Sequence, residues 1–168
     1  MRHSPFVVNV AALRRRPGSR RSEARRGPIG GLEVTGSAVP TGADVSVSVV
    51  LEALPGAVVA KGTVTAPWQG QCRRCLGEAR GVLSVEVREL FEEDHDPEET
   101  YPLSGEQIDL ERLARDTVLL ELPQVPLCQE LCRGLCPSCG ADLNTGSCAC
   151  RTETADPRWA ALDALREG

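Results

Sequence analysis

The sequence predicts an α+β fold in which an antiparallel β-meander is followed by a central amphipathic helix and a cysteine-rich C-terminal segment. Three observations support this prediction. Apolar and polar residues alternate in stretches between residues 45 and 91, which is the period of half-buried strands. Apolar residues then recur at three- and four-residue spacing from Leu110 to Val118, the period of a helix with one buried face. Six of the eight cysteines follow residue 127, in closely spaced pairs.

Residues 1–27 stand apart by their charge. They carry eight arginines and a single acid, Glu23, whereas the remainder of the chain carries 11 basic and 23 acidic residues. A basic segment on an acidic body is typical of proteins that contact a polyanion, so we predict a basic N-terminal arm over 1–27. The alternative is that the arm folds back onto the protein's own acidic surface.

The β-rich body is predicted over residues 28–127. Its expected strands cover 45–52, 57–66 and 82–91, with a turn at Pro55-Gly56 between the first two. A helix over 109–122 completes the body. Asp109 can cap its first turn because the carboxylate accepts a hydrogen bond from a free backbone N–H group, and Pro123 ends the helix.

The cysteines carry the chemistry of this chain. They form four pairs: Cys72 and Cys75, Cys128 and Cys132, Cys136 and Cys139, and Cys148 and Cys150. Two residues between paired cysteines let both sulfurs face one metal ion while the backbone turns, and Gly140 directly after Cys139 permits the tight conformation of such a turn. Two pairs complete a closed, structural four-thiolate site for Zn²⁺. Eight thiolates therefore predict two zinc sites.

Chain order suggests how the cysteines divide between the two sites. A local, zinc-ribbon-like site takes Cys136, Cys139, Cys148 and Cys150, and by elimination the second takes Cys72, Cys75, Cys128 and Cys132. The segment 128–168 is thus predicted as a zinc-binding unit, ending in a short amphipathic helix that begins at Asp156-Pro157. A redox role for C-x2-C is the alternative. However, a thioredoxin-type motif opens a helix in a βαβ unit, and no such pattern surrounds Cys72.

Catalytic motifs are not found in the sequence. It has no glycine-rich phosphate loop, nucleophile elbow or His-Glu zinc motif, and neither His3 nor His95 has a visible catalytic partner. We therefore expect a protein that is not an enzyme and takes no small-molecule substrate. The apolar run 6–13 is too short to span a membrane and precedes its arginines, unlike a secretory signal, so we predict a cytoplasmic protein. A mitochondrial-type transit peptide is the alternative for the arm.

Several stretches together match one protein family. They are Leu13–Gly18, Gly62–Pro67, Gly70–Leu76, Ile108–Leu110, Leu122–Pro123, Pro126–Cys128, Gly134–Gly140 and Asp156–Leu162. In these stretches the chain resembles the YceD family of large ribosomal RNA subunit accumulation proteins, and the cysteine-rich tail resembles its Gram-positive branch. The resemblance implies a non-enzymatic factor that supports accumulation of 23S ribosomal RNA and biogenesis of the large ribosomal subunit.

The expected partners follow from the charge distribution and this resemblance. They are pre-ribosomal RNA, a basic large-subunit ribosomal protein, or both, because the arginines suit RNA and the acidic body suits a basic protein. The expected RNA contacts are Arg14, Arg15, Arg16, Arg20 and Arg21. The alternative function is a zinc-dependent protein-interaction module, for example in transcription, which ribosome co-sedimentation would distinguish.

Overall fold

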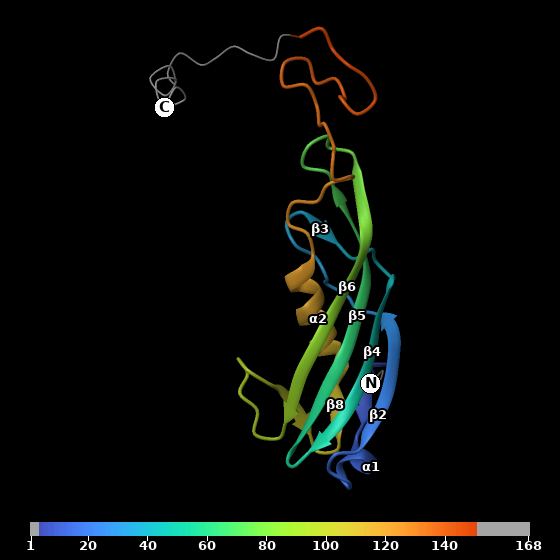
Figure 1. The fold of residues 1–168 in the computed structure, drawn as a ribbon, viewed down its shortest axis with the longest axis vertical. Coiled ribbons are helices and arrows are strands. Elements are labelled where there is room, and N and C mark those ends of the chain that lie inside the picture. The colour runs from blue at the N-terminus through green and yellow to red at the C-terminus, as the bar shows by residue number, and fades with distance from the viewer. Residues whose placement is uncertain (1–3, 151–168) are drawn as a thin grey trace, which may run out of the picture.

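A computed structural model of the chain describes residues 4–150, and Figure 1 shows its fold. The strands are β1 (Val7–Asn9), β2 (Arg20–Pro28), β3 (Ser37–Ala38), β4 (Asp44–Leu54), β5 (Ala57–Gln71), β6 (Glu78–Glu92), β7 (Tyr101–Ser104) and β8 (Gln107–Asp109), and the helices are α1 (Ala11–Arg14) and α2 (Leu110–Glu121). The protein is therefore α+β, built mostly from strands. The predicted terminal helix at Asp156 lies outside the described residues.

One curled sheet contains all the described strands. Its order is β1-β8-β7-β6-β5-β4-β2, with β3 paired to β5, and the pairs are antiparallel except for β6 with β7. The curl brings the two edges of the sheet together. A Cβ on Gly27 of β2 would lie 2.9 Å from Pro5, and the Arg21 guanidinium donates to the Asn9 carbonyl oxygen at 2.7 Å.

The predicted meander is confirmed, and its strands are longer than predicted. Gly56 adopts φ of +77° between β4 and β5, the value that position i+2 of a type II turn requires. β5 and β6 pair along fifteen residues, well beyond the predicted end at residue 66. Pro67 is compatible with this extension. The pairing of β4 with β5 stops at Thr65, so no β4 residue opposite Pro67 needs the backbone N–H group that proline lacks.

The segment predicted as a basic arm is part of the sheet. β1 pairs with β8, and all nine residues of β2 pair with β4. Acidic residues neutralise its arginines: Arg20 pairs with Glu52 and Arg26 with Asp44, whereas Arg21 and Arg25 both pair with Glu23. Residues 4–27 are therefore not a free arm. They match the alternative prediction, in which the basic segment folds back onto the protein's own acidic residues. The physical reason is that an edge strand exposes both its sides and so needs few apolar residues.

α2 covers the inner face of the sheet and confirms the predicted helix. Its Leu110, Leu113, Ala114 and Val118 are buried, and Asp109 accepts a hydrogen bond from the Glu111 N–H at 2.9 Å. The core beneath it is aliphatic, with Phe6 and Phe91 as its largest fully buried side chains. No helix within residues 4–150 has both the length and the apolar character needed to cross a membrane.

The long β5–β6 hairpin gives the molecule its elongated shape. In Figure 1 the hairpin runs along most of the molecule's length, the segment that follows α2 passes its tip and extends beyond it, and α1 lies at the opposite end. All eight cysteines lie at or beyond the tip of this hairpin or in the segment after α2. The fold thus separates the cysteines from most of the N-terminal arginines.

Candidate metal centres

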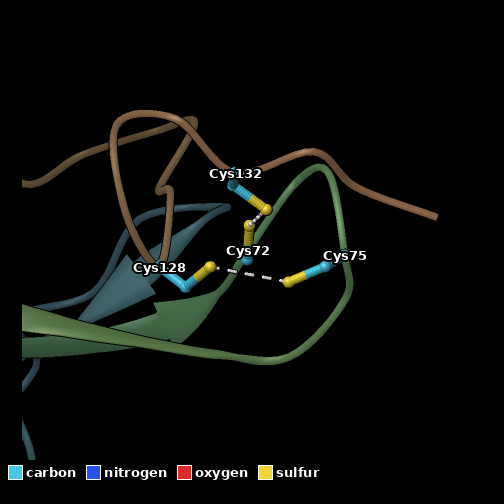
Figure 2. Close-up of side chains that lie close together, drawn as sticks. All are labelled: Cys72, Cys75, Cys128 and Cys132. Atoms are coloured by element: carbon cyan, nitrogen blue, oxygen red, sulfur yellow. Dashed lines mark hydrogen bonds between the residues drawn. The ribbon is translucent and has the colours of Figure 1, made fainter. Parts of the chain in front are cut away.

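The first group of cysteines joins the β5–β6 turn to the segment after α2. Cys72 and Cys75 lie on the turn, Cys128 and Cys132 lie on the later segment, and Figure 2 shows the four side chains facing one another. The Sγ atoms of Cys72 and Cys132 are 3.7 Å apart, and those of Cys75 and Cys128 are 3.6 Å apart. A tetrahedron with metal–sulfur bonds of about 2.3 Å has edges of about 3.8 Å, whereas a disulfide needs about 2 Å. The spacing therefore suits a metal ion and not a disulfide.

The second group is contained in the last part of the described chain. Its members are Cys136, Cys139, Cys148 and Cys150, whose sulfurs all lie within 4.8 Å of one another. The structure thus brings together two four-cysteine groups, with the membership that chain order suggested. Both could hold a metal ion, and neither leaves a position for substrate, as expected of structural sites.

The two groups begin with the same backbone turn. The Leu76 N–H donates to the Cys72 carbonyl at 2.9 Å, and the Gly140 N–H donates to the Cys136 carbonyl at 2.8 Å. A second hydrogen bond then closes each turn, from the N–H of the first cysteine to the carbonyl five residues later, at 2.8 Å in both. This shared pattern holds each cysteine pair with both sulfurs on one side of its turn.

The residue after each turn adopts a left-handed conformation. Gly140 has φ of +73°, as the sequence suggested, but the equivalent residue in the first turn is Leu76, with φ of +59°. Leu76 is the one non-glycine residue with positive φ among residues 4–150. Because a Cβ in this conformation approaches the following carbonyl oxygen, Leu76 carries a strain of about 1 kcal/mol.

We expect Leu76→Gly to stabilise the protein. The Leu76 side chain is 56% exposed, so its loss removes little packing while the backbone strain is relieved. A gain of about 1 kcal/mol raises Tm by about 2 to 4 °C in a chain of this size, measured by thermal unfolding of metal-loaded protein. The matched variant Gly140→Leu should lower Tm, since it introduces the same strain. A lower Tm for Leu76→Gly would contradict this account.

One thiol of each group is held as a thiolate more readily than an ordinary cysteine. The backbone N–H of Cys75 donates toward the Cys72 sulfur and is the largest cause that lowers the pKa of Cys72 to about 6. The backbone N–H of Cys139 likewise lowers the pKa of Cys136 to about 6. Each turn therefore presents one preformed thiolate, the form that binds metal.

In each group the pKa of another thiol shifts in the opposite direction, to a higher value. Hydrogen bonding to Cys132 raises the pKa of Cys128 to about 12, and hydrogen bonding to Cys139 raises the pKa of Cys150 to about 12. These thiols keep their protons until a cation replaces them. This arrangement is typical of clustered metal ligands, because four thiolates repel one another without a cation.

Trp68 joins the first group to the main core. Its indole lies over Gly81 of the paired strand, where a Cβ would come within 2.8 Å of the indole Nε1. The ring contacts both the main core and the small buried cluster of Cys72, Ala79 and Cys132. The hairpin tip and the core therefore form one continuous packed unit, a link that the strand pattern did not reveal.

Arg74, between the two cysteines of the first turn, holds the later segment in place. Its guanidinium donates to the Cys132 carbonyl oxygen at 2.9 Å, and its own carbonyl accepts from the Leu135 N–H at 3.1 Å. Glycine suits position 134, because its φ is +76° and a Cβ there would lie only 3.0 Å from the Arg74 carbonyl oxygen. Sequence reasoning missed this role, since an arginine in a turn is normally solvated.

The predicted RNA-contact arginines have different surroundings. Arg14 forms an ion pair with Glu93 at 2.6 Å and donates to the Gly105 carbonyl oxygen at 2.8 Å. Arg20 forms an ion pair with Glu52, and Arg21 with Glu23. Arg15 and Arg16 have no ion pair among residues 4–150. A surface hollow of about 460 Å³ beside α1 is lined by Ala12, Leu13, Arg15, Arg16, Ser19, Arg20 and Arg21. We call it the arginine hollow.

The fold and the cysteine groups define an α+β protein with two closed sites suited to metal ions. The sequence profile of the YceD family, described as "Large ribosomal RNA subunit accumulation protein YceD", matches residues 60–166. The chain belongs to this family.

Relatives support the assignment. An uncharacterized protein of Mycobacterium tuberculosis is 39% identical over 173 residues, which cover 95% of this chain and 80% of that protein. A second, from Mycobacterium leprae, is 32% identical over 177 residues, covering 95% and 76%. A chloroplastic "Large ribosomal RNA subunit accumulation protein YCED homolog 1" of Arabidopsis thaliana is 37% identical over 67 residues, covering 40% of this chain and 21% of that protein. No solved structure matches the chain.

Proposed function

We propose that this protein is a non-enzymatic zinc-binding factor that supports accumulation of 23S ribosomal RNA and thereby biogenesis of the large ribosomal subunit. The observation that carries the proposal is the occurrence of two closed four-cysteine groups in a chain of the YceD family. The family name supplies the link to large-subunit RNA, and the closed groups favour a structural role for the metal.

Zinc is the metal that this donor set fits best. Four thiolates at tetrahedral spacing, with no oxygen or nitrogen ligand, select soft or borderline cations and disfavour magnesium and calcium. Zinc brings no redox chemistry, so its contribution is to fix the hairpin tip to the segment after α2. Cys72, Cys75, Cys128 and Cys132 would hold one ion, and Cys136, Cys139, Cys148 and Cys150 the other.

The arginine hollow is the surface we propose for RNA. Arg15 and Arg16 form no ion pair with any residue from 4 to 150, so their guanidinium groups are available for bidentate contacts with phosphate oxygens. Arg14 is excluded from this role, because it holds the loop that carries Glu93. Of the five arginines predicted to contact RNA, we therefore propose Arg15 and Arg16 for phosphate binding, and Arg20 and Arg21 line the hollow beside them.

We expect the double variant Arg15→Glu/Arg16→Glu to bind 23S ribosomal RNA at least about tenfold more weakly than the parent chain. Two lost phosphate contacts also reduce the slope of log affinity against log salt by about 2. Filter binding of the zinc-loaded full chain to 23S RNA transcripts, over a range of salt concentrations, measures both effects. Thermal unfolding should be unchanged within a few degrees, because neither side chain is packed.

The matched control is Lys61→Glu/Arg88→Glu. These exposed residues are cross-strand neighbours on the outer face of β5 and β6, so the control makes the same change in net charge at another site. It should retain most of the RNA affinity. Equal losses in the two double variants would mean that only overall charge matters. Unchanged binding in both would mean that RNA contacts another part of the surface. Co-sedimentation with basic large-subunit proteins would then test whether the acidic surface binds one of them.

A further inference from the structure

Asn144 of the second cysteine segment touches a sulfur of the first group. Its side-chain Nδ2 lies 3.4 Å from the Cys132 Sγ and donates to the Asp142 carboxylate at 2.7 Å. Its Oδ1 accepts from the Arg133 backbone N–H at 2.7 Å and from the Gln129 side chain at 3.4 Å. One amide thus connects the loop that carries Cys128 and Cys132 with the loop between Cys139 and Cys148.

The orientation of this amide is fixed by chemistry. A backbone N–H can only donate, so the side-chain atom 2.7 Å from the Arg133 nitrogen must be the amide oxygen. The nitrogen therefore points at Cys132. A hydrogen bond from N–H to a metal-bound thiolate removes part of the negative charge that four sulfurs place around one ion, and so favours the loaded site.

Backbone contacts hold Asn144 in this position. The Leu143 N–H donates to the Gly134 carbonyl at 2.9 Å, and Leu135 forms an isolated antiparallel bridge with Asp142. Leu135 in turn donates to the Arg74 carbonyl in the first cysteine turn. The loop that carries Asn144 lies between Cys139 and Cys148, so a metal ion in the second group fixes both ends of that loop.

We infer that Asn144 is a positioning residue that couples the two metal sites, so that occupancy of the second group tightens metal binding by the first. The inference rests on the proposed function, in which both groups hold zinc. The coupling is reciprocal, because a factor by which one site raises the affinity of the other must apply in both directions. Filling of either site then raises the affinity of the other, while each group still binds metal when the other is disabled.

Trp68 allows the first group to be followed separately. It packs against Cys72 and Cys132, and the second tryptophan of the chain is Trp159. In a Trp159→Phe background, quenching of Trp68 emission by cobalt(II) reports filling of the first group. The absorption of cobalt–thiolate bonds reports filling of both groups. Competition with a chelator then gives the affinity of the first group in the full chain.

We expect Asn144→Ala to weaken metal binding by the first group by about tenfold, within the range for residues that support metal ligands. Asn144→Asp should weaken it further, because it keeps the oxygen that accepts from Arg133 and places a carboxylate against the thiolate. Thr145→Ala is the control, since the Thr145 hydroxyl donates to the Asp142 carbonyl oxygen and forms no hydrogen bond to a cysteine sulfur among residues 4–150. Its metal affinity should equal that of the parent chain.

A Cys148→Ser background separates coupling from local structure. With the second group disabled, the affinity of the first group should fall, and adding Asn144→Ala should have a much smaller effect than in the parent chain. The inference is overturned if Asn144→Ala and Asn144→Asp leave the first group unchanged, or if their effects are the same in both backgrounds. A parent chain that binds no metal in either group would instead refute the proposed zinc function.

Discussion

Replacing Cys72 with serine is expected to reduce bound zinc from two ions to one per chain and to unfold the tip of the β5–β6 hairpin together with the loop that carries Cys128 and Cys132. Cys72 is fully buried, and its group joins two segments that are separated by more than fifty residues. Because the binding energy of a structural zinc is folding energy for the elements it joins, losing one ligand releases both. The effect should extend to Trp68, which packs against the cluster.

Cys148→Ser is the matched comparison. The second group is local, so its loss should release residues 136–150 and leave the β5–β6 hairpin protected. Hydrogen exchange followed by mass spectrometry locates the loss, and elemental analysis counts the zinc ions. Identical patterns of lost protection in the two variants would mean a single shared cluster. Less than about half an equivalent of zinc in the parent chain would refute both sites.

Gly62→Ala is expected to lower the free energy of unfolding by about 3 kcal/mol, a large effect for one methyl group. Gly62 lies between Val49 and Val87 on the inner face of the sheet. A Cβ there would meet the Ser48 carbonyl oxygen and lie 2.7 Å from the Val49 Cα. Both obstacles are backbone atoms of β4, so the paired strand must move away and disturb the core.

Thermal unfolding tests this expectation. A loss of about 3 kcal/mol lowers Tm by about 6 to 12 °C in a chain of this size. Gly30→Ala is the control, because its Cβ would meet no atom within 4 Å and its φ is not positive. This control should be neutral or slightly stabilising, since alanine restricts the unfolded chain. Equal Tm values for the two variants would show that β4 and β5 can separate at Gly62 without cost.

The parts of the fold that were predictable are those with a buried face. Val45, Val47 and Val49 alternate with polar residues because one side of β4 packs on the core, and that period is visible in the sequence. β2 offers no such signal. Its residues Arg20 to Arg26 are exposed or half-buried on both sides, and only pairing with β4 makes them a strand. From the sequence alone, this charge run therefore predicts a free basic arm.

The candidate metal groups were predictable for a related reason. A cysteine pair such as Cys136 and Cys139 is local, so its spacing alone indicates a common ion. Placing Cys72 near Cys132 depended on counting ligands, because no local pattern encodes a contact between segments so far apart. The contact of Asn144 with Cys132 is harder still to predict from the sequence, because it depends on how two loops are placed relative to each other.

The pairing of β1 with β8 sets the order in which the chain can fold. β4 and β5 pair across a two-residue turn, whereas Val8 of β1 pairs with Ile108, which lies 100 residues later in the chain. Closing so large a loop costs entropy before any contact compensates for it, so we expect the hairpins to form early and the N-terminal strand to join late. A nascent chain therefore completes its core only after β8 has emerged, and the first cysteine group closes later still, because Cys132 follows β8 in the sequence.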